Sequence, residues 1–491
     1  MKRATRNLIA VAVCAVVLGG AAAALSIFGG TGSGASSSPS STDASLKLVS
    51  KKSEDVVSMK VTNSSGSYTL VPVPSTSSSA ASSSLYSQTN YSVEELAGCP
   101  VDMEEIRSVV ENGFSLVATK NLGTVSSLSD YGLDDPQAEV SVKFKDGTAF
   151  NYKIGKVTAT DSSAYYVCGQ NSKKVYVASI DAGLLKDKTY FVNKGMLNIQ
   201  NTSSSSSSQS SNDFTKIVLS GSVYPKGVTI EKTSSDMDIT SPGHYGTDSN
   251  KISSLEQALS SLTADSVEAV NPNADALKKY GFDSPTAAVE FTANKKNYKL
   301  TIGKQTGSSY YAMLGGVNVV YKVTADSVSA IVKESLFSLR SKLILLPYIE
   351  TVKSVQLTSG NVTSEINVTR KEDTASSTES KKSYTYQVTG NNGKSLDYEK
   401  NYKHFYQTMI GVELLADSDQ VPSGSPSYTI QYRYFDKSGT DTLAFYPADS
   451  RRMLAVLNGD VYGTVVSDDV EKVFSALNQF ESGKTIADPN S

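Results

Sequence analysis

The stretch Tyr-Gly-Leu-Asp-Asp-Pro at residues 131–136 returns as Tyr-Gly-Phe-Asp-Ser-Pro at residues 280–285, shifted by 149 positions. Ile-Gly-Lys at 154–156 returns at 302–304, shifted by 148 positions. Two more matches follow at an offset of 145 positions: Tyr165–Tyr166 with Tyr310–Tyr311, and Val175–Tyr176 with Val320–Tyr321. Four matches in one order, with a slowly drifting offset, identify an internal repeat.

A third, diverged copy follows the second. The alternating segment 428–434 comes after Pro426 as the segment 138–144 comes after Pro136. The steps from Pro285 to Pro426 and from Tyr321 to Tyr462 are both 141 positions, so the offset agrees at two independent points. The third copy lacks the Tyr-Gly-Leu and Ile-Gly-Lys elements. The repeat nevertheless predicts three modules of about 130 to 150 residues.

Each copy begins with two alternating segments around a turn, which predict a β-hairpin. The hairpins are expected near 57–70, 217–230 and 355–368. A long hairpin loop is expected at 372–382, where a charged, serine-rich run lies between strand-like segments. The central strands follow the Tyr-Gly-Leu segment in the first two copies. We interpret Pro136, Pro285 and Pro426 as marking the start of an edge strand, because proline cannot donate to a sheet ladder.

A helix is predicted after each hairpin, and an amphipathic segment closes the module. Asp102 with Glu105, and Ser254 with Gln257, resemble capping boxes at helix starts. The apolar positions of the predicted helices share one face each: Ile106, Val109 and Val110; Leu259 and Leu262; Tyr402, Phe405, Tyr406, Met409 and Ile410; Val328, Ile331, Val332 and Leu336; Val470, Val473, Phe474 and Leu477. Helices before and after a run of strands predict an α+β fold with a mainly antiparallel sheet and flanking helices.

The first residues carry an export or anchoring signal. Lys2, Arg3 and Arg6 precede an uncharged run of 21 residues, 8–28. At about 1.5 Å per residue, a helix of that length spans a bilayer core of about 30 Å. A cleaved signal peptide is the alternative, because 21–24 contains an Ala-x-Ala pattern. Both interpretations place the rest of the chain outside the cytoplasm. We expect a single-pass membrane protein, or a secreted one if the segment is cleaved.

These features predict a division into seven segments. They are a signal anchor or signal peptide at 1–30, a Ser/Gly-rich spacer at 31–45, a first module at 46–200, a Ser-rich linker at 201–212, a second module at 213–347, a third module at 348–482 and a tail at 483–491. The two Ser-rich segments cannot bury enough apolar surface to order themselves.

The net charge and the cysteine and histidine content limit the kinds of partner and site that the chain can have. A formal net charge of -3 on 491 residues excludes an overall basic footprint for nucleic acid. Beyond the first segment the chain has two cysteines, Cys99 and Cys168, and two histidines, His244 and His404. A disulfide between the cysteines is one alternative in an oxidising compartment, and free thiols are the other.

No motif predicts a catalytic, cofactor-binding or metal-ligating residue. Lys156 and Lys304 are candidate anion contacts, but a strand end followed by Gly-Lys is more typical of a hairpin turn. Gly-Lys-Ser at 393–395 and Gly-Lys-Thr at 483–485 lack the first glycine of a phosphate loop and are interpreted as turns. Two histidines leave few ways to build a catalytic triad. Neither Asp236 with Asp238 nor Asp134 with Asp135 forms a calcium loop.

The paired tyrosines are the remaining candidates for a binding surface. They could stack against sugar rings, or they could pack in the core. Since successive residues on a strand face opposite sides, we expect one tyrosine of each pair in the core and the other partly exposed.

The Tyr-Gly-Leu-x-x-Pro segment, the Ile-Gly turn, the tyrosine pair and the Val-Tyr strand together resemble the family known as domain of unknown function 4340. The resemblance covers about 53–199 and 213–346, and the third copy only in part. Family members are anchored envelope proteins, some encoded beside gliding-motility-type ABC transporter components. The resemblance therefore implies an accessory role beside a transporter.

The sequence as a whole favours a non-enzymatic envelope protein whose modules bind or support a protein or cell-wall partner. An accessory subunit of an ABC-type transporter is the first alternative. A cell-wall-acting enzyme is the second, and it requires a cleft of convergent acidic or Ser/Lys residues in one module.

Overall fold

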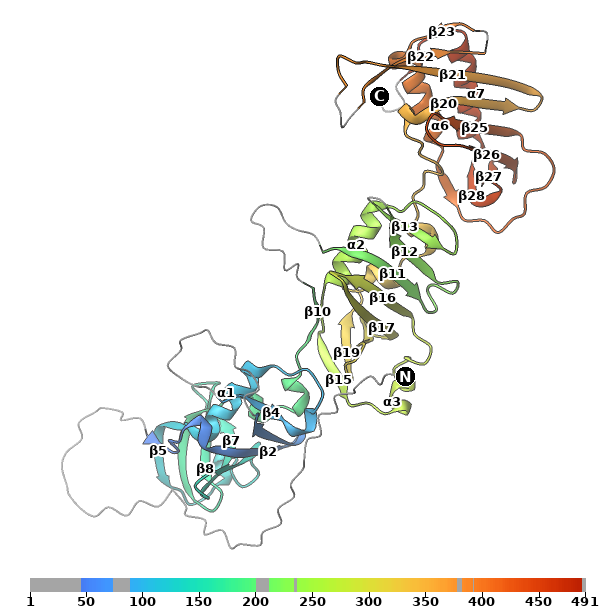
Figure 1. Cartoon of the computed structure of the whole chain (residues 1–491). Helices are drawn as coiled ribbons and strands as arrows, with labels where there is room; N and C mark the ends of the chain where they lie inside the picture. The colour runs from blue at the N-terminus through green and yellow to red at the C-terminus, as the bar shows by residue number, and fades with distance from the viewer. Residues whose placement is uncertain are drawn as a thin grey trace, which may run out of the picture. The chain divides into compact units, whose positions relative to one another are not determined.

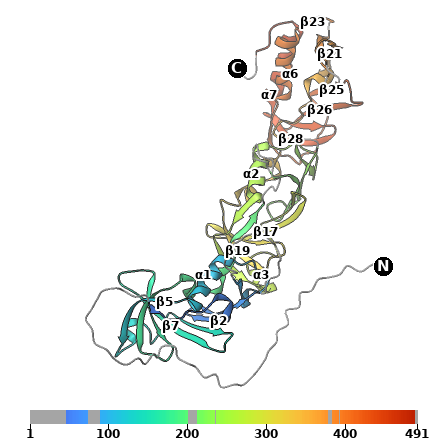
Figure 2. The same cartoon turned by 60° about the vertical axis from the view of Figure 1, so that its left-hand side comes forward.

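The computed structural model describes residues 46–73, 89–199, 212–233, 236–377, 382–391 and 393–487. The predicted anchor and spacer, nearly all of the Ser-rich run and the last four residues lie outside this part of the chain. Within the described residues, no helix combines the length and apolar character needed to cross a bilayer. The described residues form three large β-sheets with few helices (Figures 1 and 2).

The first sheet has the strand order β1-β5-β9-β8-β7-β6-β2-β3-β4. Its strands are β1 (Leu46–Lys47), β2 (Val56–Asn63), β3 (Gly66–Pro72), β4 (Tyr91–Val93), β5 (Val117–Thr124), β6 (Ala138–Phe144), β7 (Ala149–Val157), β8 (Ala164–Gly169) and β9 (Lys174–Ser179). The chain then continues through two short 3-10 helices to β10 (Gly195–Asn198), which pairs with β14 (Ser261–Thr263).

The second sheet has the order β13-β12-β11-β16-β17-β18-β19-β15. Its strands are β11 (Phe214–Ser220), β12 (Val228–Lys232), β13 (Met237–Ser241), β15 (Ser266–Val270), β16 (Ala287–Ala293), β17 (Lys296–Thr306), β18 (Ser309–Leu314) and β19 (Val319–Thr324). The third sheet has the order β23-β22-β21-β20-β25-β26-β27-β28-β24. Its strands are β20 (Val352–Ser359), β21 (Val362–Glu372), β22 (Tyr384–Thr389), β23 (Ser395–Leu396), β24 (Leu414–Ala416), β25 (Tyr428–Tyr434), β26 (Thr440–Pro447), β27 (Arg452–Leu457) and β28 (Asp460–Val466).

The three sheets share one arrangement of eight strands once β1 and β23 are set aside. In each, a hairpin and one further strand lie on one side, and a four-strand meander lies on the other. The first hairpin strand pairs with the first meander strand, as β2 does with β6, β11 with β16 and β20 with β25. The eighth strand, β5, β15 or β24, lies between the helix and the meander in the sequence and pairs with the last meander strand. We call each sheet with its helices a module.

The chain forms two compact units. One comprises Met1–Asn198, Ser261–Ser284 and Leu300–Ala325, and the other comprises Ile199–Ser260, Pro285–Lys299 and Asp326–Ser491. The first sheet belongs to one unit and the third sheet to the other.

The predicted hairpins are confirmed, and the pairings are antiparallel as expected. The run at 372–382 connects β21 to β22, which pair with each other. The interpretation of the three prolines was wrong. Pro136, Pro285 and Pro426 each precede a strand in the interior of its sheet, β6, β16 or β25. Each proline lies two residues before the strand, so its missing N–H costs the ladder nothing.

Helix α1 (Met103–Phe114) begins as the sequence predicts. The Asp102 carboxylate accepts from the backbone N–H groups of Glu104 and Glu105, and Ile106, Val109 and Val110 are buried. Glu105 does not complete a capping box, because its carboxylate accepts from the Tyr190 hydroxyl at 2.6 Å instead.

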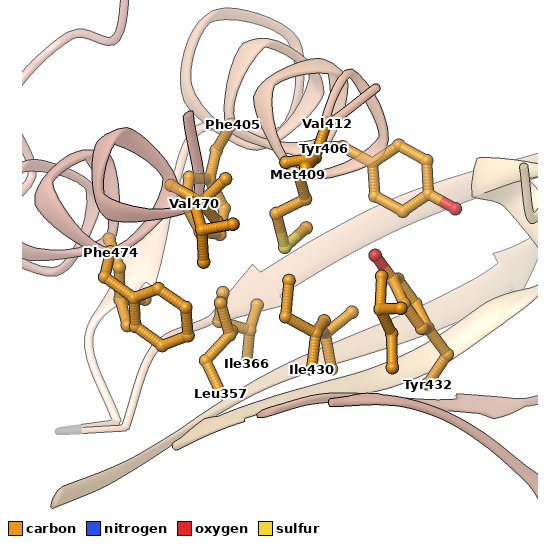
Figure 3. Close-up of a cluster of buried hydrophobic side chains, with 14 of the residues drawn as sticks. Leu357, Ile366, Phe405, Tyr406, Met409, Val412, Ile430, Tyr432, Val470 and Phe474 are labelled. Atoms are coloured by element: carbon orange, nitrogen blue, oxygen red, sulfur yellow. The ribbon is translucent and has the colours of Figure 1, made fainter. Parts of the chain in front are cut away.

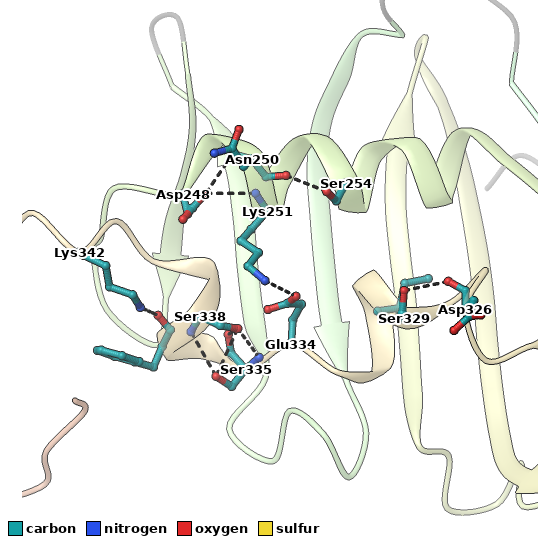
Figure 4. A network of polar contacts seen from close by, with 12 residues as sticks. Asp248, Asn250, Lys251, Ser254, Asp326, Ser329, Glu334, Ser335, Ser338 and Lys342 are labelled. Atoms are coloured by element: carbon teal, nitrogen blue, oxygen red, sulfur yellow. Dashed lines mark hydrogen bonds and ion pairs between the residues drawn. The ribbon is translucent and has the colours of Figure 1, made fainter. Parts of the chain in front are cut away.

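The predicted start of the second helix was wrong. Helix α2 (Ser249–Ser260) begins before Ser254, and the Asp248 carboxylate accepts from the N–H groups of Asn250 and Lys251. The Ser254 hydroxyl donates to the Asn250 carbonyl inside the helix (Figure 4). Aspartate satisfies the free N–H groups of a first turn and also the positive end of the helix dipole.

The closing segment of the second module is two short helices, α4 (Ser329–Val332) and α5 (Leu336–Leu339). Ser335 and Ser338 form a reciprocal cap at the start of α5. Lys251 of α2 reaches Glu334 at 2.7 Å, between the two helices (Figure 4). A further short helix, α3 (Ala274–Lys279), is capped by Asn273.

In the third module, α6 (Lys403–Ile410) and α7 (Ser467–Glu481) cover one face of the sheet (Figure 3). The predicted faces of both helices are confirmed, since Phe405, Tyr406, Val470 and Phe474 are buried. They meet inward-facing residues of the strands, among them Ile430 (Figure 3). This core closes one side of the sheet.

Tyr402 gives a stability prediction for this core. Its ring is fully buried, yet its hydroxyl has no hydrogen-bond partner among the described residues. We expect Tyr402→Phe to leave the free energy of unfolding unchanged or to raise it by about 1 kcal/mol, because a buried unpaired hydroxyl is costly. Tyr406→Phe is the matched control. Its hydroxyl donates to the Pro347 carbonyl at 2.6 Å, so its loss should cost about 1 kcal/mol. Urea unfolding measures both, and an equal loss in the two variants would contradict the prediction.

Candidate functional sites: motif contacts, connectors and a polar pocket

The two recurrent motifs contact each other in both copies. Gly155 and Gly303 are buried within strands β7 and β17. A Cβ added to either glycine would lie under 3.0 Å from the backbone carbonyl oxygen of Tyr131 or Tyr280, respectively. The Lys304 backbone N–H donates to the Tyr280 carbonyl at 3.0 Å. The Tyr-Gly segment therefore packs directly on the strand, and only glycine leaves room for it.

The interpretation of Ile-Gly-Lys as a hairpin turn was wrong, because the motif lies inside a strand. The register of the β7–β8 and β17–β18 pairs shifts at this point. The Lys156 ammonium lies 3.3 to 3.4 Å from the Ser129 and Asp130 carbonyls. It thus binds the turn that leads into Tyr131. Lys156 thus contacts backbone carbonyls of its own module, which is a structural role and not the anion contact considered above.

Both tyrosines of each pair are partly buried, so the expected split between core and surface was wrong. Tyr166 meets Tyr131 with ring centroids 5.0 Å apart, and Tyr311 meets Tyr280 at 4.7 Å. In the first module this contact belongs to a small second core with Leu133 and Cys168. These ring contacts account for the partial burial of the second tyrosine of each pair, Tyr166 and Tyr311.

The segment that leaves each of the first two modules forms backbone hydrogen bonds with that module and with the next one. Connector 1 is Phe191–Asn198. It first bonds to its own module just before α1, through the Asp102 N–H to the Phe191 carbonyl at 2.8 Å and the Asn193 N–H to the Pro100 carbonyl at 2.9 Å. Its last four residues then form β10 and pair with β14, just after α2.

Connector 2, Leu339–Leu343, makes contacts at the corresponding positions. The Asp248 N–H donates to the Leu339 carbonyl at 2.9 Å, and the Ser341 N–H to the Gly246 carbonyl at 2.8 Å, just before α2. Leu343 then bridges Glu413, just after α6. Strand β1, at the start of the first module, makes the corresponding contact, because it pairs with β5 just after α1. A short backbone ladder, β10–β14, and an isolated backbone bridge, Leu343–Glu413, therefore join consecutive modules at corresponding positions.

The Ser-rich run begins beyond connector 1. The Asn212 side-chain amide donates to the Ile199 carbonyl at 3.0 Å and to the Ser260 hydroxyl at 2.9 Å. The described residues on either side of the run are thus bonded to each other.

A buried arginine fixes the contact between the second and third modules. Arg340 of connector 2 is 1 % exposed, and its guanidinium carbon lies 3.6 Å from the Tyr245 ring centroid and 5.3 Å from that of Tyr462. Its Nη2 donates to the Tyr462 carbonyl at 2.9 Å. The Tyr462 hydroxyl donates to the His244 carbonyl at 2.8 Å. Burial lowers the pKa of Arg340, although arginine stays charged in proteins.

The charge of Arg340 is stabilised mainly by the two rings. Asp417 lies 3.5 Å away, but its side chain is 57 % exposed, so this pair contributes little. Tyr245 and Tyr462 meet edge to face at 5.2 Å and enclose the guanidinium with their rings. A cation over two desolvated rings can gain about 2 kcal/mol or more. The Arg340 Nε has no partner among the described residues.

Polar contacts also join the first and second modules. The Tyr321 hydroxyl donates to the Asn193 carbonyl of connector 1 at 3.2 Å. The Ala264 N–H donates to the Lys194 carbonyl at 2.8 Å. Cys99 lies 3.9 Å from Asn271 and is a free thiol, as is the buried Cys168. Of the two alternatives for the cysteines, the structure has the free thiols.

A polar pocket of about 390 Å³ opens on the first module between the end of α1 and the end of β9. Its polar lining residues are Ser108, Glu111, Asn112, Ser115, Ser179 and Asp181. The Asp181 carboxylate accepts from the Gly183 N–H at 2.8 Å, and the Asn112 side chain accepts from the Asp181 N–H at 2.7 Å. Burial raises the pKa of Asp181, with a smaller effect from Glu105. Sequence reasoning did not single out this pocket.

The other motifs occupy structural positions. Gly393 adopts a positive φ of 73° in a turn, and Gly483 one of 76° after α7. His404 Nδ1 lies 2.9 Å from the Ile486 carbonyl, so it holds the chain after α7. Asp134 and Asp135 lie in the loop after Tyr131, and Asp238 accepts from the Thr233 hydroxyl at 2.6 Å. Among the residues that the structure describes, no three His, Cys, Asp or Glu side chains are grouped for metal binding.

The fold defines a class: a chain of antiparallel α+β modules joined by shared connectors. A family model described as domain of unknown function DUF4340 matches residues 92–232 and 238–424, in two copies. The chain therefore belongs to the DUF4340 family. Each matched stretch begins near the strand before a helix and ends beyond the next hairpin, so it includes a connector. No curated protein and no solved structure matches the chain.

Proposed function

We propose that this chain is a non-enzymatic, membrane-anchored extracytoplasmic protein, and that its modules act as a binding and scaffold element of the cell envelope. The observation that supports this proposal most is that each connector is hydrogen-bonded to two modules. Connector 1 and connector 2 each form backbone hydrogen bonds first with the module they leave and then with the module they join. Arg340 and its two rings add a desolvated contact to the second of these joints.

Such joints suit a scaffold because they hold neighbouring modules through the backbone. A chain of independent binding domains needs only flexible linkers. Here connector 1 forms a short backbone ladder with the next module, and connector 2 forms a backbone bridge and places a buried cation against two aromatic rings. The proposed anchor at 8–28 would hold this assembly at the membrane surface.

The first test is recovery of the full chain from its own membranes, after gentle solubilisation, followed by mass spectrometry of bound proteins. We expect a stoichiometric envelope protein or cell-wall fragments in the eluate. A stoichiometric ATPase and permease would favour an accessory subunit of an ABC-type transporter, the function implied by the family resemblance. External protease on intact spheroplasts should digest the modules, and full protection of the modules would overturn the extracytoplasmic location.

A cell-wall-acting enzyme is the second candidate, and the pocket with Asp181 is the observation that favours it. A carboxyl group whose pKa is raised by burial can serve as a general acid. The test is hydrolysis of isolated cell wall by the full chain beside Asp181→Asn. Hydrolysis that Asp181→Asn abolishes, with binding retained, would establish the enzyme and overturn the non-enzymatic proposal.

A further inference from the structure

A preceding module docks at one end of the second sheet, which we call the upstream end of that module. The end is formed by the residue after β15 and by the β18–β19 turn, where the Asn271 N–H donates to the Asn318 carbonyl at 2.8 Å. Cys99 of the first module reaches this place, since its Sγ lies 3.9 Å from Asn271 Oδ1 and 3.9 Å from the Asn318 carbonyl oxygen. The turn itself, residues 315–318, contains no charged residue.

The first module has the same backbone contact at its own upstream end. The Val125 N–H, directly after β5, donates to the Lys173 carbonyl of the β8–β9 turn at 3.0 Å. Val125 therefore takes the position of Asn271, and Lys173 takes that of Asn318. The two ends have the same backbone plan, but a lysine stands where the second module has an uncharged side chain.

The chain also enters the first module from this end. β1 takes the place of a connector and runs antiparallel to β5, with Leu46 opposite Ala118 and Lys47 opposite Val117. The chain therefore reaches Leu46 from the side where β5 ends and the β8–β9 turn lies. Within the described part of the chain, no other module precedes the first one. The upstream end of the first module thus lies on the side of the predicted anchor.

The upstream end of the first module is basic. We define the lysine end as four side chains from β5, β9 and the two adjacent turns: Lys120, Lys145, Lys173 and Lys174. The first three are exposed, and Lys174 is partly exposed. Lys145 comes from the β6–β7 turn, which lies at the same end of the sheet, because the Gln170 N–H of the β8–β9 turn donates to the Asn151 carbonyl near the start of β7 at 3.2 Å.

Acidic side chains do little to offset these lysines. Residues 112–129 and 162–180, which contain β5, β8 and β9, include no aspartate or glutamate. Asp146 of the β6–β7 turn forms its ion pair with Lys51, at 2.5 Å. Lysines also keep edge strands from pairing with other sheets. That role accounts for Lys120 but not for the lysines of the β8–β9 turn, because β8 and β9 are interior strands.

The sequence sets the distance between the lysine end and the membrane. Between the predicted anchor at 8–28 and Leu46 lie 17 residues, 29–45. A Gly/Ser-rich segment of that length has an average end-to-end distance of about 23 Å. Anionic headgroups attract lysines that come within a Debye length, about 8 Å at physiological ionic strength. The anchor therefore keeps the lysine end within reach of a surface of complementary charge.

We propose that the lysine end of the first module docks on anionic lipid headgroups of the membrane that holds the anchor. This inference rests on the membrane-anchored part of the proposed function, and it names the partner that takes the place of a preceding module. The second module meets the first one at an uncharged turn, whereas the first module meets lipid phosphates with its lysine ammonium groups. Each lysine near such a surface strengthens the contact about fivefold.

Acetylation of lysines in the full chain tests the docking. The chain is reconstituted in vesicles of phosphatidylcholine alone and in vesicles of equal parts phosphatidylcholine and phosphatidylglycerol. A membrane-impermeant acetylating reagent is added, and mass spectrometry follows each lysine. We expect the lysine end to react about fivefold more slowly in the anionic vesicles, and high salt to remove this protection. Lys295 and Lys296, exposed in the β16–β17 turn of the second module, should react equally in both.

A charge variant separates docking from local structure. Lys173→Gln combined with Lys174→Gln should weaken the contact about 25-fold, so that Lys120 and Lys145 lose their protection in the anionic vesicles. The substitutions lie at the surface, and far-UV circular dichroism should stay unchanged. Lys295→Gln combined with Lys296→Gln is the matched control, because it removes the same charge from a turn of the second module. It should leave the protection of the lysine end intact.

An alkaline carbonate wash of the same vesicles reports separately on the anchor. A chain that stays in the washed vesicles, but whose lysine end reacts equally in both lipids, would overturn the docking and leave the anchor in place. A chain that the wash removes would overturn both. Protection of the lysine end by soluble polyphosphate, without protection by phosphatidylglycerol, would also overturn the docking and would assign these lysines to a phosphate-rich polymer.

Discussion

Gly303→Ala should destabilise the second module by about 3 kcal/mol, near the upper end of the usual cost of overpacking a core. The added Cβ would lie under 3.0 Å from the Tyr280 carbonyl oxygen, and that oxygen belongs to backbone held by its own bond from the Lys304 N–H. A flexible side chain could move aside, but this carbonyl cannot do so without displacing the Tyr-Gly-Phe segment. Gly155→Ala should have the same effect in the first module, against Tyr131.

Denaturant unfolding followed by circular dichroism measures the loss, and hydrogen exchange of residues 296–306 locates it. Gly246→Ala is the matched control, because an added Cβ there meets only the Ser341 Cβ at 3.6 Å. Its free energy of unfolding should change by less than about 1 kcal/mol. Equal stability of Gly303→Ala and Gly246→Ala would show that the two motifs do not depend on each other.

Arg340→Ala should loosen the joint between the second and third modules and cost about 4 kcal/mol, the sum of the two contacts that it removes. It removes a cation enclosed by Tyr245 and Tyr462 and a charged hydrogen bond to the Tyr462 carbonyl, and each contributes about 2 kcal/mol in a desolvated site. Arg340→Lys keeps the charge but loses the planar stacking, so it should restore only part of the stability.

The joint can be observed directly by hydrogen exchange of peptides around 244–248 and 460–466. We expect faster exchange there in Arg340→Ala, with the core strands β20 and β25 unaffected. Arg433→Ala is the matched control, because Arg433 is 48 % exposed and pairs with Glu365 at 3.3 Å. Such a surface pair contributes about 0 to 1 kcal/mol. Unchanged exchange at the joint in Arg340→Ala would contradict the role given to this arginine.

The elements with strong local signals could be predicted from the sequence. The hairpin strands alternate and are separated by turns, so β2–β3, β11–β12 and β20–β21 were visible, and the repeat placed them in three copies. The cap at Asp102 and the faces of α6 and α7 were equally clear. The start of α2 was less clear, because Ser254 three residues before Gln257 has the pattern of a cap, whereas the residue that caps the helix is Asp248, six positions earlier.

The joints could not be predicted, for a physical reason. The connectors contribute only a few residues each, too few for a period of 2 to show. Arg340 looks like any other arginine until residues 245 and 462 meet around it. Ile-Gly-Lys was misread because a strand interior that needs glycine for close approach has the same letters as a turn.

The backbone ladder ahead of the first module has a mechanical consequence. The N–H groups of Leu48 and Val49 donate to the Leu116 carbonyl at 2.9 and 3.3 Å, and β1 pairs with β5. If the chain is pulled through a tether ahead of Leu46, the load reaches these bonds before it reaches the hairpin of β2 and β3. The first segment to detach under tension is then this short ladder, whose loss lengthens the tether while the core of the module stays folded.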